Sequence, residues 1–248
     1  MLKLVKYEFR KQLFSKVMIL VILALLQVGF MIGLFFEKER LLATSMGLYL
    51  FLSIASVLFV AFESINTYSN DLKTKQSYML FLTPNSTYKI VGAKVLSTIV
   101  TIGLTAAVFV GATLIDFAAV LVKYDKVAKV IELIQEFSAK LFQANIDYAY
   151  IISFVIYFLF DLIAILIIGM ASITLSATFL SNSKGKAVVS IIFFFGINFV
   201  LGRIEGWVLP ARSLTSTDPY YINCVWSLGV IVVFYFLTSY MLDKKVSV

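Results

Sequence analysis

Residues 68–94 read YSNDLKTKQSYMLFLTPNSTYKIVGAK, and this polar stretch separates two hydrophobic runs. Each run is far longer than the core of a soluble protein requires. The stretch contains four lysines and a single acid, Asp71. Loops rich in Lys and Arg stay on the cytoplasmic side of a membrane. The pattern therefore predicts a cytoplasmic loop that joins two membrane spans.

A break is expected inside this loop at Thr83-Pro84-Asn85-Ser86. The residue before a proline avoids the helical region, and Asn and Ser favour turns and helix caps. We expect a short amphipathic helix before the break and a new helix that starts near Ser86 or Thr87. Such a shape fits a groove on a soluble partner. The apolar cluster of the short helix comprises Tyr78, Leu80, Phe81 and Leu82.

The composition indicates an all-α integral membrane protein. Of the 248 residues, 61% are hydrophobic and only 14% are charged, whereas soluble domains carry roughly 25% charged residues. The hydrophobic runs lack the period-two alternation of a membrane β-barrel. The net charge of +7 is interpreted as a consequence of membrane topology, and we expect no nucleic-acid partner.

Several kinds of chemistry are excluded by residues that the chain lacks. It has no histidine and one cysteine, Cys224, which excludes an intrachain disulfide, His-ligated metals and Ser-His catalysis. It also lacks the glycine-rich loop with Lys and Ser or Thr that cradles nucleotide phosphates. We therefore expect no catalytic residue, no metal and no cofactor in this chain. If nucleotide energy is used, another chain must bind the nucleotide.

A single transmembrane domain, 1–248, with six spans is predicted. Residues 1–16 are basic and amphipathic, which predicts a helix lying in the cytoplasmic interface. The alternative is the start of a signal peptide, but the basic segment is long and no small-residue cleavage site follows it. The predicted spans cover residues 17–36 and 41–67 (spans 1 and 2, within 17–67), 95–122, 148–180, 187–201 and 223–242.

The connections between the spans also differ in character. Residues 37–40 form a tight outer turn, residues 123–147 show the spacing of an extracytoplasmic amphipathic helix, and residues 202–222 are expected to be irregular and partly re-entrant. The run 148–180 is roughly 50 Å long as a helix, so it tilts, kinks near Gly169 or extends beyond the ~30 Å hydrocarbon core. Lys and Arg number 13 on the predicted inner side and 8 on the outer side, so both termini are expected in the cytoplasm.

The chain resembles the membrane subunit of type-2 ABC exporters (ABC-2 permeases). The resemblance depends on a basic amphipathic N-terminal helix, six spans and the loop between spans 2 and 3. That loop contains three features in order. They are an acid, a Leu-Pro-type run, and the apolar beginning of a helix that includes a lysine. Leu82-Thr83-Pro84 stands for the usual Leu-Pro, and Asn85-Ser86-Thr87 replaces the usual basic pair. The matching residues are Asp71, Leu80, Leu82, Pro84, Ile90, Val91 and Lys94.

The resemblance implies partners and roles. Two such subunits, identical or different, would pair in lipid and dock on two separate ABC ATPase subunits that bind ATP and Mg²⁺. Residues 1–16 would be the elbow helix, residues 68–94 the cytoplasmic coupling loop, and residues 202–222 the outer gate. The length is similar to that of permeases for peptide-antibiotic immunity or resistance in the bacterial cytoplasmic membrane. The implied coupling residues are Asp71, Tyr78, Leu80, Phe81, Leu82, Pro84, Tyr88 and Lys94.

Polar residues inside the spans are candidates for a transport path. Asp161 lies about 20 Å into its span, near mid-bilayer, where an acid costs roughly 2.5–3.5 kcal/mol to insert. It is either a transport or proton-titrating site or a structural acid bonded to a neighbouring helix. Glu63 and Asp116 lie nearer span ends, where snorkelling also explains them. Asn198 is a further candidate.

Gly29 and Gly33 form a G-x-x-x-G pattern in the first span. This pattern permits close helix approach, and a dimer seam is one place for it. The 23 phenylalanines either line a path for an amphipathic substrate or face lipid.

The sequence thus leads to an exporter hypothesis: a non-catalytic permease moves a hydrophobic or amphipathic substrate, such as an antimicrobial peptide, a lipid-linked molecule or a drug. The alternative is a proton- or ion-coupled secondary transporter that uses Asp161, although no internal repeat is visible. An intramembrane enzyme is disfavoured by the missing histidine, and a channel by the lack of a pore signature.

Overall fold

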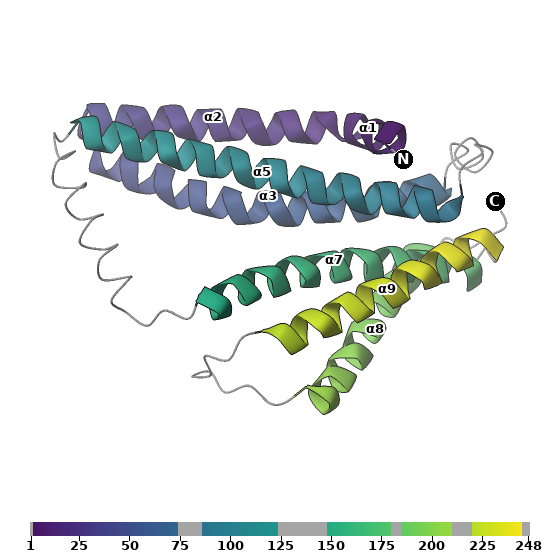
Figure 1. The fold of residues 1–248 in the computed structure, drawn as a ribbon. Coiled ribbons are helices and arrows are strands. Elements are labelled where there is room, and N and C mark those ends of the chain that lie inside the picture. The colour runs from purple at the N-terminus through teal and green to yellow at the C-terminus, as the bar shows by residue number, and fades with distance from the viewer. Residues whose placement is uncertain (1, 74–85, 124–147, 180–184, 210–219, 245–248) are drawn as a thin grey trace. The chain divides into compact units, whose positions relative to one another are not determined.

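The computed structural model describes residues 2–73, 86–123, 148–179, 185–209 and 220–244. Within these ranges the chain is helical and contains no strand, which confirms the all-α class (Figure 1). The helices are α1 (Leu2–Lys11), α2 (Leu13–Phe35), α3 (Glu39–Lys73), α5 (Thr87–Lys123), α7 (Tyr148–Phe179), α8 (Lys186–Val208) and α9 (Tyr221–Lys244).

Six of these helices, α2, α3, α5, α7, α8 and α9, are long and apolar enough to cross a membrane. The shortest has 23 residues, and about 20 residues are needed for the hydrocarbon core. Large apolar side chains cover their outer faces; Phe51 and Phe62 of α3, for example, are 71% and 69% exposed. Contiguous apolar surface of this kind is stable in contact with lipid, not with water. The architecture is that of a multi-pass membrane protein.

The ends of two helices allow a direct comparison with the sequence. α5 begins at Thr87, one of the two positions predicted from the proline break. α8 differs from the prediction, because it continues from Gly202 to Val208, where an irregular segment was expected. From Lys186, a helix that ended at Leu201 would be roughly 24 Å long, whereas one that ends at Val208 reaches roughly 35 Å and can span the core.

The chain forms two compact units, and α1, α3 and α5 contribute to both. The first unit comprises residues 1–8, 62–99 and 147–248, and the second comprises residues 9–61 and 100–146.

The second unit is built from α2 and the adjoining parts of α3 and α5, which run alongside one another (Figure 1). α2 and α3 are joined by a tight turn in which the Lys38 N–H donates to the Gly33 carbonyl at 3.0 Å and Glu37 adopts a φ of 55°. This is the left-handed ending common at helix C-termini. Lys123 closes the same end, because its Nζ donates to the Leu34 carbonyl and lies 3.3 Å from Glu37 Oε1.

The first unit centres on α7, which packs against α8 and α9 (Figure 1). α7 also approaches the end of α3 closely, because a Cβ on Gly169 would lie 2.8 Å from Cδ1 of Ile65. The buried core of this unit joins four helices and consists of Tyr68, Val91, Val95, Ile167, Met170 and Leu242.

Candidate functional site

The candidate site is a buried polar network in the first unit, on the facing stripes of α3 and α5. Ser64, Tyr68 and Asp71 are spaced by four and three residues along α3, and Lys94 and Thr98 by four along α5. Residues at these spacings lie on one face of a helix. All five are buried, so the helical repeat places polar groups on the two faces that meet inside the unit.

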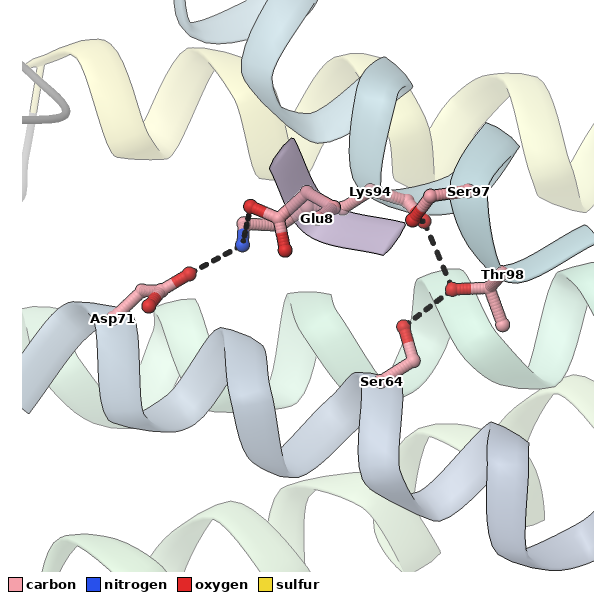
Figure 2. A network of polar contacts seen from close by, with 6 residues as sticks. All are labelled: Glu8, Ser64, Asp71, Lys94, Ser97 and Thr98. Carbon is pink, nitrogen blue, oxygen red and sulfur yellow. Dashed lines mark hydrogen bonds and ion pairs between the residues drawn. The ribbon is translucent and has the colours of Figure 1, made fainter. Parts of the chain in front are cut away.

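Lys94 is the centre of this network (Figure 2). Its Nζ donates to Oε1 of Glu8, on α1, at 2.7 Å and also to Oδ2 of Asp71. The side chains of Lys94, Glu8 and Asp71 are only 3%, 5% and 9% exposed. One ammonium therefore joins α1, the last turns of α3 and the second turn of α5. We call Glu8, Asp71 and Lys94 the ion-pair triad.

A chain of hydroxyl groups continues from the ion-pair triad along α5 (Figure 2). The hydroxyls of Ser97 and Thr98 donate to the Lys94 carbonyl at 3.0 and 2.8 Å. Oγ of Ser64 lies 2.5 Å from Oγ1 of Thr98. A hydroxyl has one proton to donate, and that of Thr98 is used at the Lys94 carbonyl, so Ser64 is the donor to Thr98.

Tyr68 extends the polar contacts of α3 to α7. Its hydroxyl lies 2.6 Å from Oγ1 of Thr174, which itself donates to the Met170 carbonyl at 2.9 Å. Tyr68 is therefore the donor to Thr174. Its ring is packed in the apolar core that joins these helices. The end of α3 is thus held by polar contacts to α1, α5 and α7.

The energetics make the ion-pair triad a firm connection between helices. A buried ammonium or carboxylate without a partner costs several kcal/mol of solvation free energy, and paired charges recover this only with good hydrogen-bond geometry. The charges come from three different helices. Moving any one helix away would therefore leave a charged group without its partner in apolar surroundings. We therefore expect α1, the end of α3 and the start of α5 to move together.

The triad has the properties of a structural connection between helices. No group of three or more His, Cys, Asp or Glu side chains suited to a metal occurs among the residues that the structure describes. The three charged groups are buried and engaged with one another.

Two residues from the predicted coupling set, Asp71 and Lys94, are brought together by the fold. Tyr88 lies elsewhere: its carbonyl accepts a 2.7 Å hydrogen bond from the Tyr235 hydroxyl, and its ring packs against Tyr235 and Phe236 of α9. Five of the predicted residues lie outside the described ranges, namely Tyr78, Leu80, Phe81, Leu82 and Pro84. The predicted helix at 123–147 also lies outside them beyond Lys123.

Sequence reasoning missed Glu8 as a site residue. One signal was available, because Glu8 is the single acid among five basic residues in 1–16. An acid on an otherwise basic helix implies a local cationic partner, but the sequence does not say that this partner is 86 residues away.

The transport-path candidates occupy different environments. Asp116 of α5 accepts a hydrogen bond from the Gln27 amide of α2, while Asn198 donates to the Phe194 carbonyl of its own helix at 2.8 Å. Asp161 of α7 is half-buried and interacts electrostatically with Glu205 of α8. Glu63 of α3 is also half-buried. Asp116 and Asn198 thus form their hydrogen bonds with groups outside the ion-pair triad.

Gly29 and Gly33 lie against α3 of the same chain. A Cβ on Gly33 would be 2.8 Å from the backbone nitrogen of Leu42, and one on Gly29 would be 4.0 Å from Cβ of Ser45. The close approach at Gly33 thus serves the α2–α3 hairpin. Because this contact occupies the glycine face of α2, the predicted dimer seam would have to use another face of the helix.

The comparisons with known proteins add no relative. Neither the protein-family models nor the curated proteins nor the solved structures give a significant match to the chain.

Proposed function

We propose that the chain is the membrane subunit of an ATP-driven exporter of the ABC-2 type, as the sequence resemblance implies. The observation that supports this most is the ion-pair triad. Asp71 and Lys94 lie near the two ends of the expected coupling loop, residues 68–94, and Lys94 pairs both with Asp71 and with Glu8 of α1.

In this proposal, the ATPase pushes on the coupling loop, residues 68–94, and three helices transmit the motion. A push on that segment acts on the end of α3 and the start of α5, which the triad holds together. α1 moves with them because Glu8 shares the ammonium of Lys94. Since α3 and α5 each run through both compact units, a shift at these ends is passed along two continuous helices to the second unit.

The finer features of the proposal come from the sequence. Both termini are in the cytoplasm, α1 lies in the membrane interface, and the membrane is the cytoplasmic membrane of a bacterium. A second permease subunit and two ATPase subunits complete the exporter, and ATP with Mg²⁺ binds to the ATPase alone. The substrate is hydrophobic or amphipathic, and this chain is not itself an enzyme.

The decisive experiment is a pull-down from native membranes. The tagged protein is purified in mild detergent after crosslinking, and co-purifying chains are identified by mass spectrometry. We expect a stoichiometric ATPase with a phosphate-binding loop, and we expect it to be lost when Leu80 and Phe81 are both replaced by aspartate.

A matched control is provided by two exposed, adjacent phenylalanines at the opposite end of α3. Phe35 and Phe36 are 64% and 71% exposed and lie in the α2–α3 turn, so their replacement by aspartate should leave the ATPase bound. Co-purification of no ATPase, or equal loss in both double variants, would contradict the proposed coupling.

A proton- or ion-coupled secondary transporter is the second candidate, and one observation favours it. The carboxyl groups of Asp161 and Glu205 interact electrostatically inside the apolar helices α7 and α8, and intramembrane acids often mark ion pathways. Transport by the purified chain in vesicles with a proton gradient and no ATPase, abolished by Asp161→Asn, would favour this candidate over the exporter.

A further inference from the structure

The second unit contains a cavity of about 370 Å³ between α2, α3 and α5. Small-molecule sites occupy roughly 300–1,000 Å³ and combine apolar walls with a few polar groups. The cavity has this character, and none of the residues that line it belongs to the ion-pair triad. Its apolar walls are formed mainly by Leu26, Phe30, Met46, Leu50, Phe117 and Val120.

The polar groups at the cavity are acceptors or engaged hydroxyls. Asp116 lines it, together with Ser45, Tyr49 and Thr113. The Ser45 hydroxyl donates to the Leu41 carbonyl at 2.8 Å. The Tyr49 hydroxyl donates to the Phe109 carbonyl, and Thr113 donates to the same carbonyl at 2.9 Å. Their protons are therefore used within the protein. The carboxylate of Asp116 is the charged group that the cavity offers to a ligand.

Asp116 has acceptor capacity that its neighbours do not fill. Its Oδ1 accepts from the Gln27 amide, while Oδ2 accepts no hydrogen bond from any residue in the described ranges. Oε1 of Gln27, next to it, is buried and also has no donor there. An ionised carboxylate has about four acceptor sites. An unfilled carboxylate oxygen on a residue that lines an apolar cavity is complementary to a ligand that brings an N–H donor and a positive charge.

We propose that this cavity binds hydrophobic amines, with the protonated amine at Asp116 and the hydrocarbon between α2, α3 and α5. Asp116 is seven residues before the end of α5, so it lies roughly 10 Å from that end. An ammonium can thus reach the carboxylate while its hydrocarbon follows the apolar walls. The inference rests on the proposed function and adds that the exported substrate carries a positive charge. The binding site itself can be tested without an ATPase.

The test uses two photoreactive probes that differ only in their head group. One is a C12 primary amine and the other the matching alcohol, each with the photoreactive group at the end of the chain remote from the head. The full-length protein in lipid nanodiscs is irradiated with each probe, and labelled peptides are mapped by mass spectrometry. We expect the amine to label peptides that contain Phe30, Met46 or Phe117.

The variants separate charge from shape. Asp116→Asn should lower labelling by the amine about tenfold or more, because charged hydrogen bonds are the stronger ones, and should leave labelling by the alcohol unchanged. Asp116→Glu keeps the charge, so labelling by the amine should remain. Met46→Trp fills the cavity and should reduce labelling by both probes. Glu39→Gln removes an exposed acid of the same unit. It serves as the control and should leave labelling by both probes unchanged.

Three results would overturn the inference. Equal amine labelling of the wild type and Asp116→Asn would mean that the carboxylate does not recognise the ligand. Loss of both probes in Asp116→Asn and in Asp116→Glu would mean that Asp116 only maintains the shape of the cavity. Labelling by neither probe would mean that membrane lipid fills it. None of these results bears on the pull-down, and loss of the ATPase there would not affect probe binding.

Discussion

Asp71 and Asp116 are both acids on apolar helices, yet their side chains have opposite kinds of partner, one charged and one neutral. Asp71 is almost fully buried and meets the ammonium of Lys94, which also holds Glu8. Asp116 is half-buried, meets the neutral amide of Gln27 and lines a cavity of about 370 Å³. The first acid is paired with a fixed cation from the protein. The second has a neutral partner and unfilled acceptor capacity.

From this difference we expect a structural acid and a binding acid inside a membrane protein to differ in the source of their counter-charge. A carboxylate in an apolar environment needs a counter-charge. Where the chain provides one, as at Asp71, the group becomes part of the connection between helices. Where the chain provides only an amide, as at Asp116, the counter-charge can come from a ligand. The predictions below test this distinction in order of expected effect.

The largest effect is expected for Lys94→Met, which leaves Glu8 and Asp71 buried without their shared cation. Removing one partner of a buried ion pair typically costs about 3–5 kcal/mol. The free energy of unfolding, measured by titration of mixed micelles with SDS, should fall by that amount.

Glu8→Gln and Asp71→Asn are the matched controls for Lys94→Met. Each leaves Lys94 with one carboxylate, so each should destabilise less than Lys94→Met. If either single acid variant were as unstable as Lys94→Met, the ammonium would not be the shared centre of the triad.

The second prediction concerns the hairpin that carries the cavity. Gly33→Val should destabilise the protein by about 1–3 kcal/mol, the usual range for overpacking, because its Cβ would lie 2.8 Å from the backbone of Leu42. Gly29→Ala is the control, since its Cβ would make an ordinary contact at 4.0 Å with Ser45. The same SDS titration measures both, and equal stability of the two variants would contradict the close approach at Gly33.

The third prediction tests the contact between α3 and α7. Tyr68→Phe keeps the ring in the core and removes the 2.6 Å hydrogen bond to Thr174, so we expect a loss of about 1 kcal/mol. Tyr240→Phe, at a side chain that is 50% exposed, should change the unfolding free energy much less. A Tyr68→Phe protein as stable as the wild type would show that this hydroxyl adds nothing to the connection around Asp71.

The smallest effect on stability is expected for Asp116→Asn. The asparagine oxygen can still accept from Gln27, so the unfolding free energy should change by less than about 1 kcal/mol, while amine labelling is lost. A destabilisation as large as that of Lys94→Met would place Asp116 among the structural acids and remove the contrast with Asp71.

The sequence predicted much of the fold because the membrane makes simple demands. A span needs about 20 apolar residues in a helix, and hydrophobic runs reveal this directly. The helix start at Thr87 followed from local turn chemistry at Pro84 and Asn85. The end of α8 at Val208 was missed, because Gly202, Arg203, Glu205 and Gly206 interrupt the apolar pattern without interrupting the helical backbone.

The site was predicted only in part. Asp71 and Lys94 were selected by their order in the loop, but nothing in the sequence said that they touch. Glu8 is 86 residues from Lys94, and Gln27 is 89 residues from Asp116. Periodicity tells which residues share a helix face, but not which face of another helix it meets.

By itself, the sequence determined the class of the protein, its membrane-spanning helices and the exclusion of histidine chemistry, because these depend on composition and on local hydrogen bonding. The tertiary structure decided which acid is paired and which is left to line a cavity. That choice depends on the packing of helices distant in the chain, which places Lys94 between Glu8 and Asp71 and gives Asp116 only Gln27. The same residue type thus becomes a connection between helices in one place and a candidate ligand contact in the other.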